Sequence, residues 1–459
     1  MPKNYAPAPE VQPASTSPTR TRGRRAVWLL GPAMVAGVAY LDPGNVASNM
    51  TAGAAFGYLL VWVVVLGNVM AWLIQYLSAK LGIVTGESLP QLLGRRIRRP
   101  GLRRAYWLQA ELVAMATDIA EVIGGAVALH LLFGIPLVWG GAITGVVSMA
   151  LLVVQTRRGA QAFETVLIGL LAIIAIGFSA GLLFAPPDPA GVAGGLLPRF
   201  DGADSVLLAA SILGATIMPH AIYAHSALTR DRFAPAVAVG GVAHGGGGNG
   251  GAASGADDGT TSADAHGDLE RARGISMPRL LRATRWDVTI ALAVAGTVNL
   301  AILLLAAANL AGVDGTDSLE GAYGALRDGL GPLVATLFAV GLLASGLAST
   351  SVGAYAGAEI MHGLLHVRVP LVARRLVTLV PALVILGAGI DPTAALVLSQ
   401  VVLSFGIPFA LIPLVSLTAR RDVLGGYRNR TITTVAGVVA SVLLISLNVA
   451  LLWLVFTGG

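Results

Sequence analysis

Eleven long apolar segments follow one another along this chain, separated by shorter polar stretches. A helix needs about 20 apolar residues to cross the hydrocarbon core of a bilayer. Only 12% of the residues are charged, against roughly a quarter in soluble domains. We therefore predict an all-α polytopic membrane protein with about 11 transmembrane helices. The predicted spans are 26–53, 57–81, 105–133, 136–155, 163–185, 205–229, 284–311, 332–364, 371–389, 393–418 and 432–456.

The distribution of basic residues predicts how these spans are oriented. With the N-terminus in the cytoplasm, only Arg199 and Arg327 of the 30 Lys and Arg residues fall on the outer side. Because basic residues concentrate in cytoplasmic loops, we predict a plasma-membrane protein with a cytoplasmic N-terminus and an external C-terminus. The arginines lie at the ends of apolar spans. The net charge of +6 therefore indicates the lipid bilayer as surroundings and no nucleic-acid partner.

A single transmembrane domain is predicted over residues 26–456. Residues 1–25, which precede it, are rich in Pro, Ser and Thr and are expected to form a disordered cytoplasmic tail. Residues 234–269 form a Gly-rich insert that cannot bury a core, so a disordered cytoplasmic loop is expected there. Cysteine is absent, which excludes disulfides and thiolate metal sites.

Two of the apolar segments are broken near the middle by a short polar run that contains proline. The first run is Asp42-Pro43-Gly44-Asn45, and the second is Met218-Pro219-His220. Proline removes a backbone donor and interrupts a helix. Within a bilayer, the freed groups are tolerated only where they are buried in protein or line a cavity. Broken segments in corresponding halves of a membrane protein are typical of a transport site.

The residue types at the breaks favour a transition-metal dication. Asp42 supplies a carboxylate, Asn45 an amide oxygen, and unwinding frees the carbonyl of Ala215. The thioether of Met218 adds little for Ca²⁺ or Mg²⁺ but contributes for Mn²⁺, Fe²⁺, Co²⁺ or Cd²⁺. Two alternatives remain open: Asp42 caps the following half-helix, and Met218 is a packing residue.

Titratable side chains near the breaks suggest a route for protons. A histidine side chain ordinarily titrates near neutral pH. His220 and His225 are therefore interpreted as proton carriers, with metal ligation or a core position as alternatives. Asp118 and Glu121, three residues apart, share a helix face, and Glu111 lies on a similar face. Carboxylates within a membrane helix suggest a proton-conducting wall. Ion pairs with arginines are the alternative, and both roles are compatible. The candidate partners are Arg232, Arg374 and Arg375.

These motifs resemble those of the Nramp family of proton-coupled divalent metal transporters, in particular its bacterial manganese importers. Asp42-Pro43-Gly44-Asn45 is similar to one family signature, and Ala215 with Met218-Pro219-His220 is similar to the other. The resemblance covers nearly all of residues 26–456. It implies two inverted five-helix repeats, spans 1–5 and 6–10, with broken helices 1 and 6 and a peripheral span 11.

The resemblance also implies roles for individual residues. It implies metal held by Asp42, Asn45, the Ala215 carbonyl and Met218, joined by Gln400 in some states. It implies protons that pass by way of Asp42, His220, Asp118 and Glu121 toward the cytoplasm.

Together these features predict a proton-coupled symporter that works by alternating access and imports Mn²⁺, Fe²⁺ and related dications. It is expected to be a secondary active transporter rather than an enzyme, with no permanently bound cofactor and no obligatory protein partner. One alternative is a transporter of the same fold class with an organic substrate such as an amino acid. Asp42 disfavours it, because such a site points a positive half-helix end at a substrate carboxylate. Another alternative is a receptor or scaffold that transports nothing.

Overall fold

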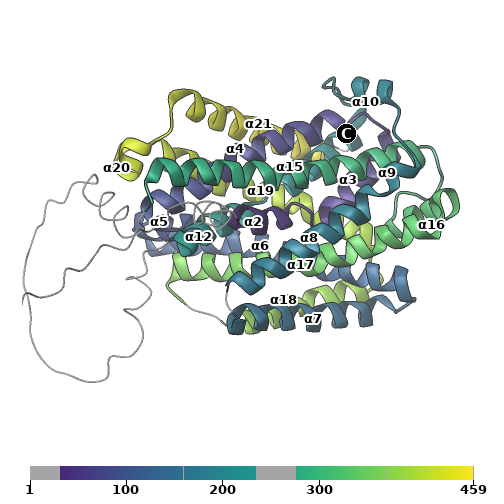
Figure 1. Ribbon diagram of the computed structural model, residues 1–459, viewed down its shortest axis with the longest axis horizontal. Coiled ribbons are helices and arrows are strands. Elements are labelled where there is room, and N and C mark those ends of the chain that lie inside the picture. Colours follow the sequence, from purple (N-terminus) through teal and green to yellow (C-terminus); the bar gives the residue numbers. More distant parts are fainter. Residues whose placement is uncertain (1–30, 159, 234–274, 368–369, 458–459) are drawn as a thin grey trace, which may run out of the picture.

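The computed structural model describes residues 31–158, 160–233, 275–367 and 370–457, and within these ranges the chain forms helices and no strands. The helices run mostly along the long axis of the molecule (Figure 1). α5 (Leu89–Arg96) and α20 (Arg421–Leu424) lie at one end, and α10 (Pro189–Gly195) and α16 (Leu319–Leu330) lie at the other (Figure 1). The predicted tail 1–25 and the predicted insert 234–269 lie outside the described residues.

The described part of each predicted span corresponds to a helix or to a pair of half-helices. Residues 26–30 of the first predicted span lie outside the described residues. The first is split into α2 (Pro32–Ala39) and α3 (Pro43–Phe56), and the sixth into α11 (Gly202–Thr216) and α12 (Pro219–Phe233). The unbroken spans are α4 (Val61–Thr85), α6 (Pro100–Phe133), α7 (Leu137–Arg158), α8 (Ala160–Ser179), α15 (Met277–Asn309), α17 (Pro332–Leu365), α18 (Leu371–Gly387), α19 (Pro392–Ala419) and α21 (Thr431–Thr457). The remaining short helices are α9 (Gly181–Phe184) and η1 (Gly425–Tyr427).

Within the described residues, 8 helical segments are long and apolar enough to cross a membrane, and one of them, Gly202–Phe233, consists of α11 and α12 together. The other predicted spans are the broken pair α2 and α3, α7, whose apolar part covers Leu137–Leu151, and α18, which has 17 residues. Several helices begin earlier than their apolar segments do. α6 starts at Pro100 and α15 at Met277, because Arg-containing turns continue the helix beyond its apolar part.

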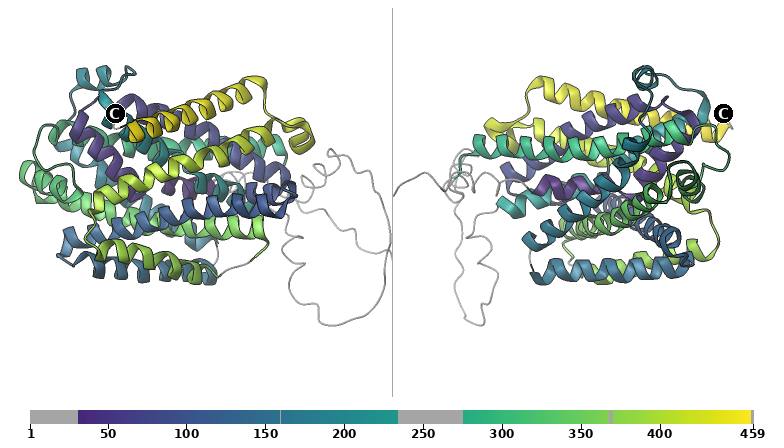
Figure 2. Two further views of the ribbon diagram at one scale, coloured as in Figure 1. Left: turned by 180° about the vertical axis from the view of Figure 1, so that it is seen from behind. Right: turned by 45° about the vertical axis from the view of Figure 1, so that its right-hand side comes forward.

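The two broken pairs lie inside the bundle and the long helices enclose them. α17 packs along α6 and α8, while α15 packs against α3 and α4. α7 and α18 lie together on one side, and α21 lies on the opposite side against α19 (Figures 1 and 2). All of α2 except Met34 is buried. This arrangement surrounds the broken segments with protein, as their unpaired backbone groups require.

A carboxylate on α15 fixes the start of α2. Asp287 accepts hydrogen bonds from the backbone N–H of Gly31 (3.1 Å) and of Ala33 (2.9 Å). The first N–H groups of a helix have no partner within the helix, so this side chain takes the place of a local cap. The cap joins the two helices through residues that are more than 250 positions apart in the sequence.

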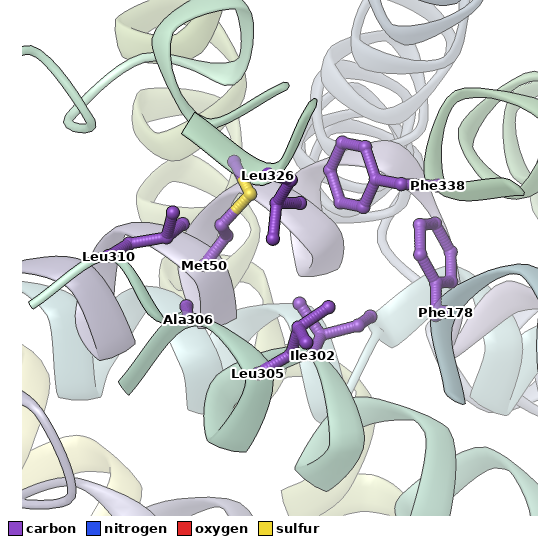
Figure 3. A pocket seen from close by; sticks show the side chains of 8 residues that line it. All are labelled: Met50, Phe178, Ile302, Leu305, Ala306, Leu310, Leu326 and Phe338. Carbon is purple, nitrogen blue, oxygen red and sulfur yellow. The ribbon is translucent and has the colours of Figure 1, made fainter. Parts of the chain in front are cut away.

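A small apolar hollow lies where α3 meets α8, α15, α16 and α17 (Figure 3). Met50 of α3 faces Phe178 and Phe338 across it. The two phenyl rings pack edge to face with centroids 5.4 Å apart. Only apolar side chains line the hollow, so α3 contacts the neighbouring helices there through apolar packing alone.

Candidate functional site

The first break begins where α2 ends at Ala39, and α3 starts again at Pro43. Asp42 caps α3, because its Oδ1 accepts a hydrogen bond from the backbone N–H of Asn45 at 2.8 Å. The helix-cap interpretation of Asp42 is therefore correct. It accounts for only one of the two carboxylate oxygens, since Oδ2 accepts a hydrogen bond from Nε2 of Gln400 at 3.0 Å.

The second break frees a carbonyl by the same chemistry. In a continuous helix, the N–H of residue 219 would bond to the carbonyl of Ala215, but residue 219 is proline and has no N–H. Ala215 O instead accepts a hydrogen bond from Nδ2 of Asn45 at 3.1 Å. The same Nδ2 donates to the carbonyl of Tyr40 at 2.6 Å. Asn45 therefore links the two breaks.

Gln400 reaches this point from α19 because the facing helix position has no side chain. A Cβ atom on Gly44 would overlap the amide group of Gln400. The Oε1 atom of Gln400 is buried and accepts no hydrogen bond from the described residues. A buried acceptor without a donor is costly, so this oxygen is available to a further partner.

The predicted metal-binding residues are enclosed together. Asp42, Asn45, Met218 and Gln400 are all 0% exposed, as is Ala215. Hydrogen bonds join all of them except Met218, which lies at the second break, three residues after Ala215. Within the described residues, no three His, Cys, Asp or Glu side chains lie close enough together to hold a metal ion. The predicted set instead consists of one carboxylate, neutral oxygens and, at the second break, a thioether.

Buried arginines of α18 pair with the carboxylates of α6. Arg374 contacts Glu111 (Nε to Oε1, 3.0 Å) and Asp118 (NH1 to Oδ2, 3.2 Å). Arg375 lies 3.6 Å from Asp118 Oδ1 and 3.8 Å from Glu121 Oε2. The predicted ion pairs with these two arginines are therefore present. Arg232 is half-buried near the C-terminal end of α12.

The contacts of Glu121 are looser than those of its neighbours. Neither oxygen of Glu121 accepts a hydrogen bond within the described part of the chain. Arg375 is instead held by Ser148 (3.0 Å) and Thr350 (3.2 Å). Three carboxyl groups thus face two guanidinium groups, and one excess negative charge remains unless one carboxyl holds a proton.

The charged cluster fits against α17 through glycines. A Cβ atom on Gly353 would lie 3.1 Å from Asp118 Oδ1, and one on Gly357 would overlap the guanidinium of Arg374. These glycines are four residues apart and share a helix face. A larger residue at either position would push the cluster away from α17.

The two predicted histidines both lie on α12 but contact different neighbours. His220 Nδ1 is 3.3 Å from Thr117 Oγ1, next to Asp118, so it lies between the second break and the charged cluster. His225 Nδ1 is 2.7 Å from Gln75 Oε1. Gln75 in turn hydrogen-bonds to the hydroxyl of Tyr40 at the first break.

Some polar residues that contact the site were not predicted. Gln75 bonds to Tyr40 and His225, and Asn299 donates to the carbonyl of Tyr40 at 2.9 Å. Each is a polar residue inside an apolar segment, and this is the signal that would have identified it. Asp287, which caps α2, carries the same signal.

A sequence model described as "Natural resistance-associated macrophage protein-like" matches residues 33–454. This chain belongs to the Nramp family. A relative from Mycobacterium tuberculosis (strain ATCC 25618 / H37Rv), named divalent metal cation transporter MntH, is 57% identical over 440 residues. The match covers 96% of this chain and 94% of the relative.

Solved Nramp structures have the same fold. The chain matches a crystal structure of the Eremococcus coleocola manganese transporter with a TM-score of 0.75 and 30% identity, over 94% of this chain and 87% of that one. A more distant likeness links it to MhsT, which was solved in complex with L-phenylalanine. There the TM-score is 0.53, the identity is 12%, and the match covers 93% of this chain and 98% of that one. That second likeness concerns the fold alone.

Proposed function

We propose that this protein is a proton-coupled secondary transporter that imports Mn²⁺ and Fe²⁺, and also Cd²⁺ and Co²⁺, into the cytoplasm by alternating access. The observation that carries the proposal is the enclosed meeting of one carboxylate with neutral oxygens at two helix breaks, beside Met218. The names of the M. tuberculosis relative and of the E. coleocola transporter support it.

The proposal extends to the setting of the transporter. The protein lies in the plasma membrane with its N-terminus in the cytoplasm and its C-terminus outside. It is not an enzyme, it has no permanently bound cofactor, and it needs no obligatory protein partner. The metal ion is its substrate, and the proton is its co-substrate.

Binding of the dication requires a local exchange of partners. Asn45 Nδ2 now donates to Ala215 O. With an ion present, the Asn45 amide oxygen and the Ala215 carbonyl both turn toward it, and this hydrogen bond is replaced. Gln400 Oε1, a buried acceptor without a donor, supplies one more oxygen. Asp42 supplies the only negative charge in the set.

Met218 gives the set its preference for transition metals. Oxygen ligands alone suit Ca²⁺ and Mg²⁺ as well as they suit Mn²⁺. A thioether adds favourable contact only with softer ions. The sulfur therefore supports a substrate among the transition metals.

Protons are proposed to travel through the charged cluster of α6 and α18. Asp42 passes a proton by way of His220 to Asp118 and Glu121, and the path continues past Glu111 toward the cytoplasm. Arg374 and Arg375, which pair with these carboxylates, belong to the same path, and so does Arg232 on α12. His225 is assigned to proton handling as well. The excess negative charge of the cluster supports this role, since one proton neutralises it.

The proposal is tested with purified protein in liposomes, where Mn²⁺ uptake and internal pH are recorded together. The unchanged protein is expected to take up Mn²⁺ and to acidify the lumen. Asp42→Asn keeps an oxygen that can cap α3 but removes the charge, so uptake is expected to fall to background in a folded, inserted protein. Mn²⁺ uptake near the normal rate in this variant would overturn the proposal, as would uptake of an amino acid in place of the metal.

A further inference from the structure

Four arginines cluster at the start of α6: Arg98, Arg99, Arg103 and Arg104. We refer to them as the α6 arginine cluster. All but Arg103 are exposed, and Arg103 is half-buried. The preceding arginines differ, because Arg95 pairs with Glu87, and Arg96 pairs with Asp422 at 3.3 Å. No ion pair of the cluster arginines occurs within the described residues, so their charge is not neutralised by the protein there.

Two buried N–H donors beside the cluster also have no acceptor. These are Nε of Arg103 and the indole Nε1 of Trp107, each enclosed and without a hydrogen-bond partner within the described ranges. The residues are four apart and share one face of α6. A buried donor without an acceptor is costly, and two on one face suit a single group with several acceptor oxygens.

The neighbouring face of α6 is apolar and open. Arg104, Leu108 and Leu112 are spaced by four, so they form one stripe along the helix. Leu108 is 51% exposed and Leu112 is 55% exposed. In a protein that spans a membrane, such a stripe faces the acyl chains of lipids. The stripe begins at the arginines, and Trp107 stands beside it, as tryptophan does at the edges of bilayers.

We propose that this surface is a binding site for an anionic phospholipid. The phosphate accepts hydrogen bonds from Arg103 Nε and Trp107 Nε1. The other arginines of the α6 arginine cluster attract its negative charge electrostatically. An acyl chain lies along Leu108 and Leu112. The proposal does not depend on the identity of the transported ion. It assigns specific recognition of a headgroup to a region whose charge would otherwise serve only to orient the chain in the membrane.

The nearest acid on this face does not oppose such binding. Glu111 follows Trp107 by one helical turn, but Arg374 binds it at 3.0 Å, which compensates its charge. Free phosphate offers the same oxygens as a lipid headgroup. The exposed apolar stripe next to the donors favours a molecule that has both a phosphate and a hydrocarbon chain.

The experiment measures lipid binding by native mass spectrometry on purified protein titrated with phosphatidylglycerol or phosphatidylcholine. The test variant is Arg103→Gln/Trp107→Phe, which removes the guanidinium and the indole N–H and keeps an aromatic ring. Its matched control is Arg282→Gln/Trp286→Phe on α15, where an exposed arginine and an exposed tryptophan have the same spacing. A third arm adds inorganic phosphate as a competitor.

The unchanged protein is expected to retain phosphatidylglycerol in preference to phosphatidylcholine. The test variant is expected to bind phosphatidylglycerol at least roughly fivefold more weakly, since each basic residue near an anionic surface contributes about that factor. The control variant should bind as the unchanged protein does. An equal loss of phosphatidylglycerol binding in both variants would show that only general charge matters and would overturn the proposal. Unchanged binding in the test variant would also overturn it. Displacement of the lipid by millimolar phosphate would assign the site to the free ion instead.

Discussion

In the proposed function, Asp42 combines two tasks that the residue pattern alone presents as alternatives, a helix cap and a metal ligand. Its Oδ1 caps α3, and its Oδ2 faces Gln400 at 3.0 Å. The cap fixes the carboxylate in place, so the second oxygen is positioned before any ion arrives. Such preorganisation lowers the cost of binding. A helix cap within a broken span is therefore compatible with the proposed ligand role and supports it geometrically.

Replacing the proposed thioether ligand should change selectivity more than rate. Met218→Ala leaves the oxygen atoms in place but removes the only soft atom from the set. We expect Mn²⁺ uptake to survive in part, while Ca²⁺ and Mg²⁺ become effective competitors. Uptake of Mn²⁺ in liposomes is measured at increasing concentrations of Ca²⁺. If the variant excludes Ca²⁺ as well as the parent does, Met218 is only a packing residue.

Gly44 is expected to act through Gln400. In Gly44→Ala, the new methyl group displaces the Gln400 amide, whose end is flexible enough to move aside. The hydrogen bond to Asp42 is then lost, and Mn²⁺ affinity should fall roughly tenfold, the scale of one hydrogen bond to a charged group. Calorimetric titration with Mn²⁺ measures the effect in Gly44→Ala, Gln400→Ala and the double variant.

The double variant serves as the control for this mechanism. Residues that act through one contact give non-additive effects, so the double variant should bind Mn²⁺ no more weakly than either single variant. Additive losses would show that Gly44 affects the site by another route, such as the packing of α3.

Glu121 and Asp118 are expected to affect protons rather than metal binding. A proton carrier must change charge during transport, whereas a metal ligand stays ionised. Glu121→Gln or Asp118→Asn should therefore leave Mn²⁺ binding by calorimetry largely intact and weaken the proton flux recorded by an internal pH dye. His220→Ala should act in the same way. Loss of metal binding with proton flux retained in either carboxylate variant would contradict this assignment.

At the scale of elements, α2 is a short helix that depends on a distant cap. Asp287→Ala removes the acceptor for Gly31 and Ala33, and loss of a helix cap typically costs about 1 kcal/mol. We expect the fraction of molecules in which α2 is detached from the bundle to rise roughly fivefold. The chain has no cysteine, so a single Ala36→Cys label on α2, at a position 1% exposed, reports this directly through its reaction rate with a thiol reagent.

The matched control for this experiment is Asp287→Asn, which keeps one acceptor oxygen and the shape of the side chain. Its labelling rate should lie between those of the parent and the alanine variant. Equal labelling rates in all three proteins would mean that packing, and not the cap, holds α2 in place.

The breaks were predictable because proline acts locally. Pro219 removes the backbone N–H that would donate to the Ala215 carbonyl, whatever surrounds it. Each apolar segment likewise predicts a helix from its own residues. The contacts of Gln75, Asn299 and Asp287 could not be predicted in the same way, because their partners lie on other helices and depend on how those helices pack. The boundaries of α6 and α15 also departed from prediction, since Arg-rich turns extend a helix beyond the apolar segment that identifies it.

At the scale of the whole molecule, the candidate site and the charged cluster share one framework. α6 carries Thr117 beside His220 and the three carboxylates, while α17 supplies the glycines that admit them. α18 contributes the arginines. Any shift of α6 relative to α17 would therefore alter the cluster and the second break together. Under the proposed function, this gives a physical link between the protonation of the cluster and the shape of the site.

Complete enclosure of the site also limits the speed of passage. Its side chains are 0% exposed, so an ion enters or leaves only when helices move, and collective motions of this kind take microseconds to milliseconds. Each cycle carries the ions bound at that moment and no more. The rate should therefore level off as ion concentration rises, and a chemical cross-link between α2 and α15 should stop transport. An open pore would conduct in proportion to concentration and would tolerate such a link.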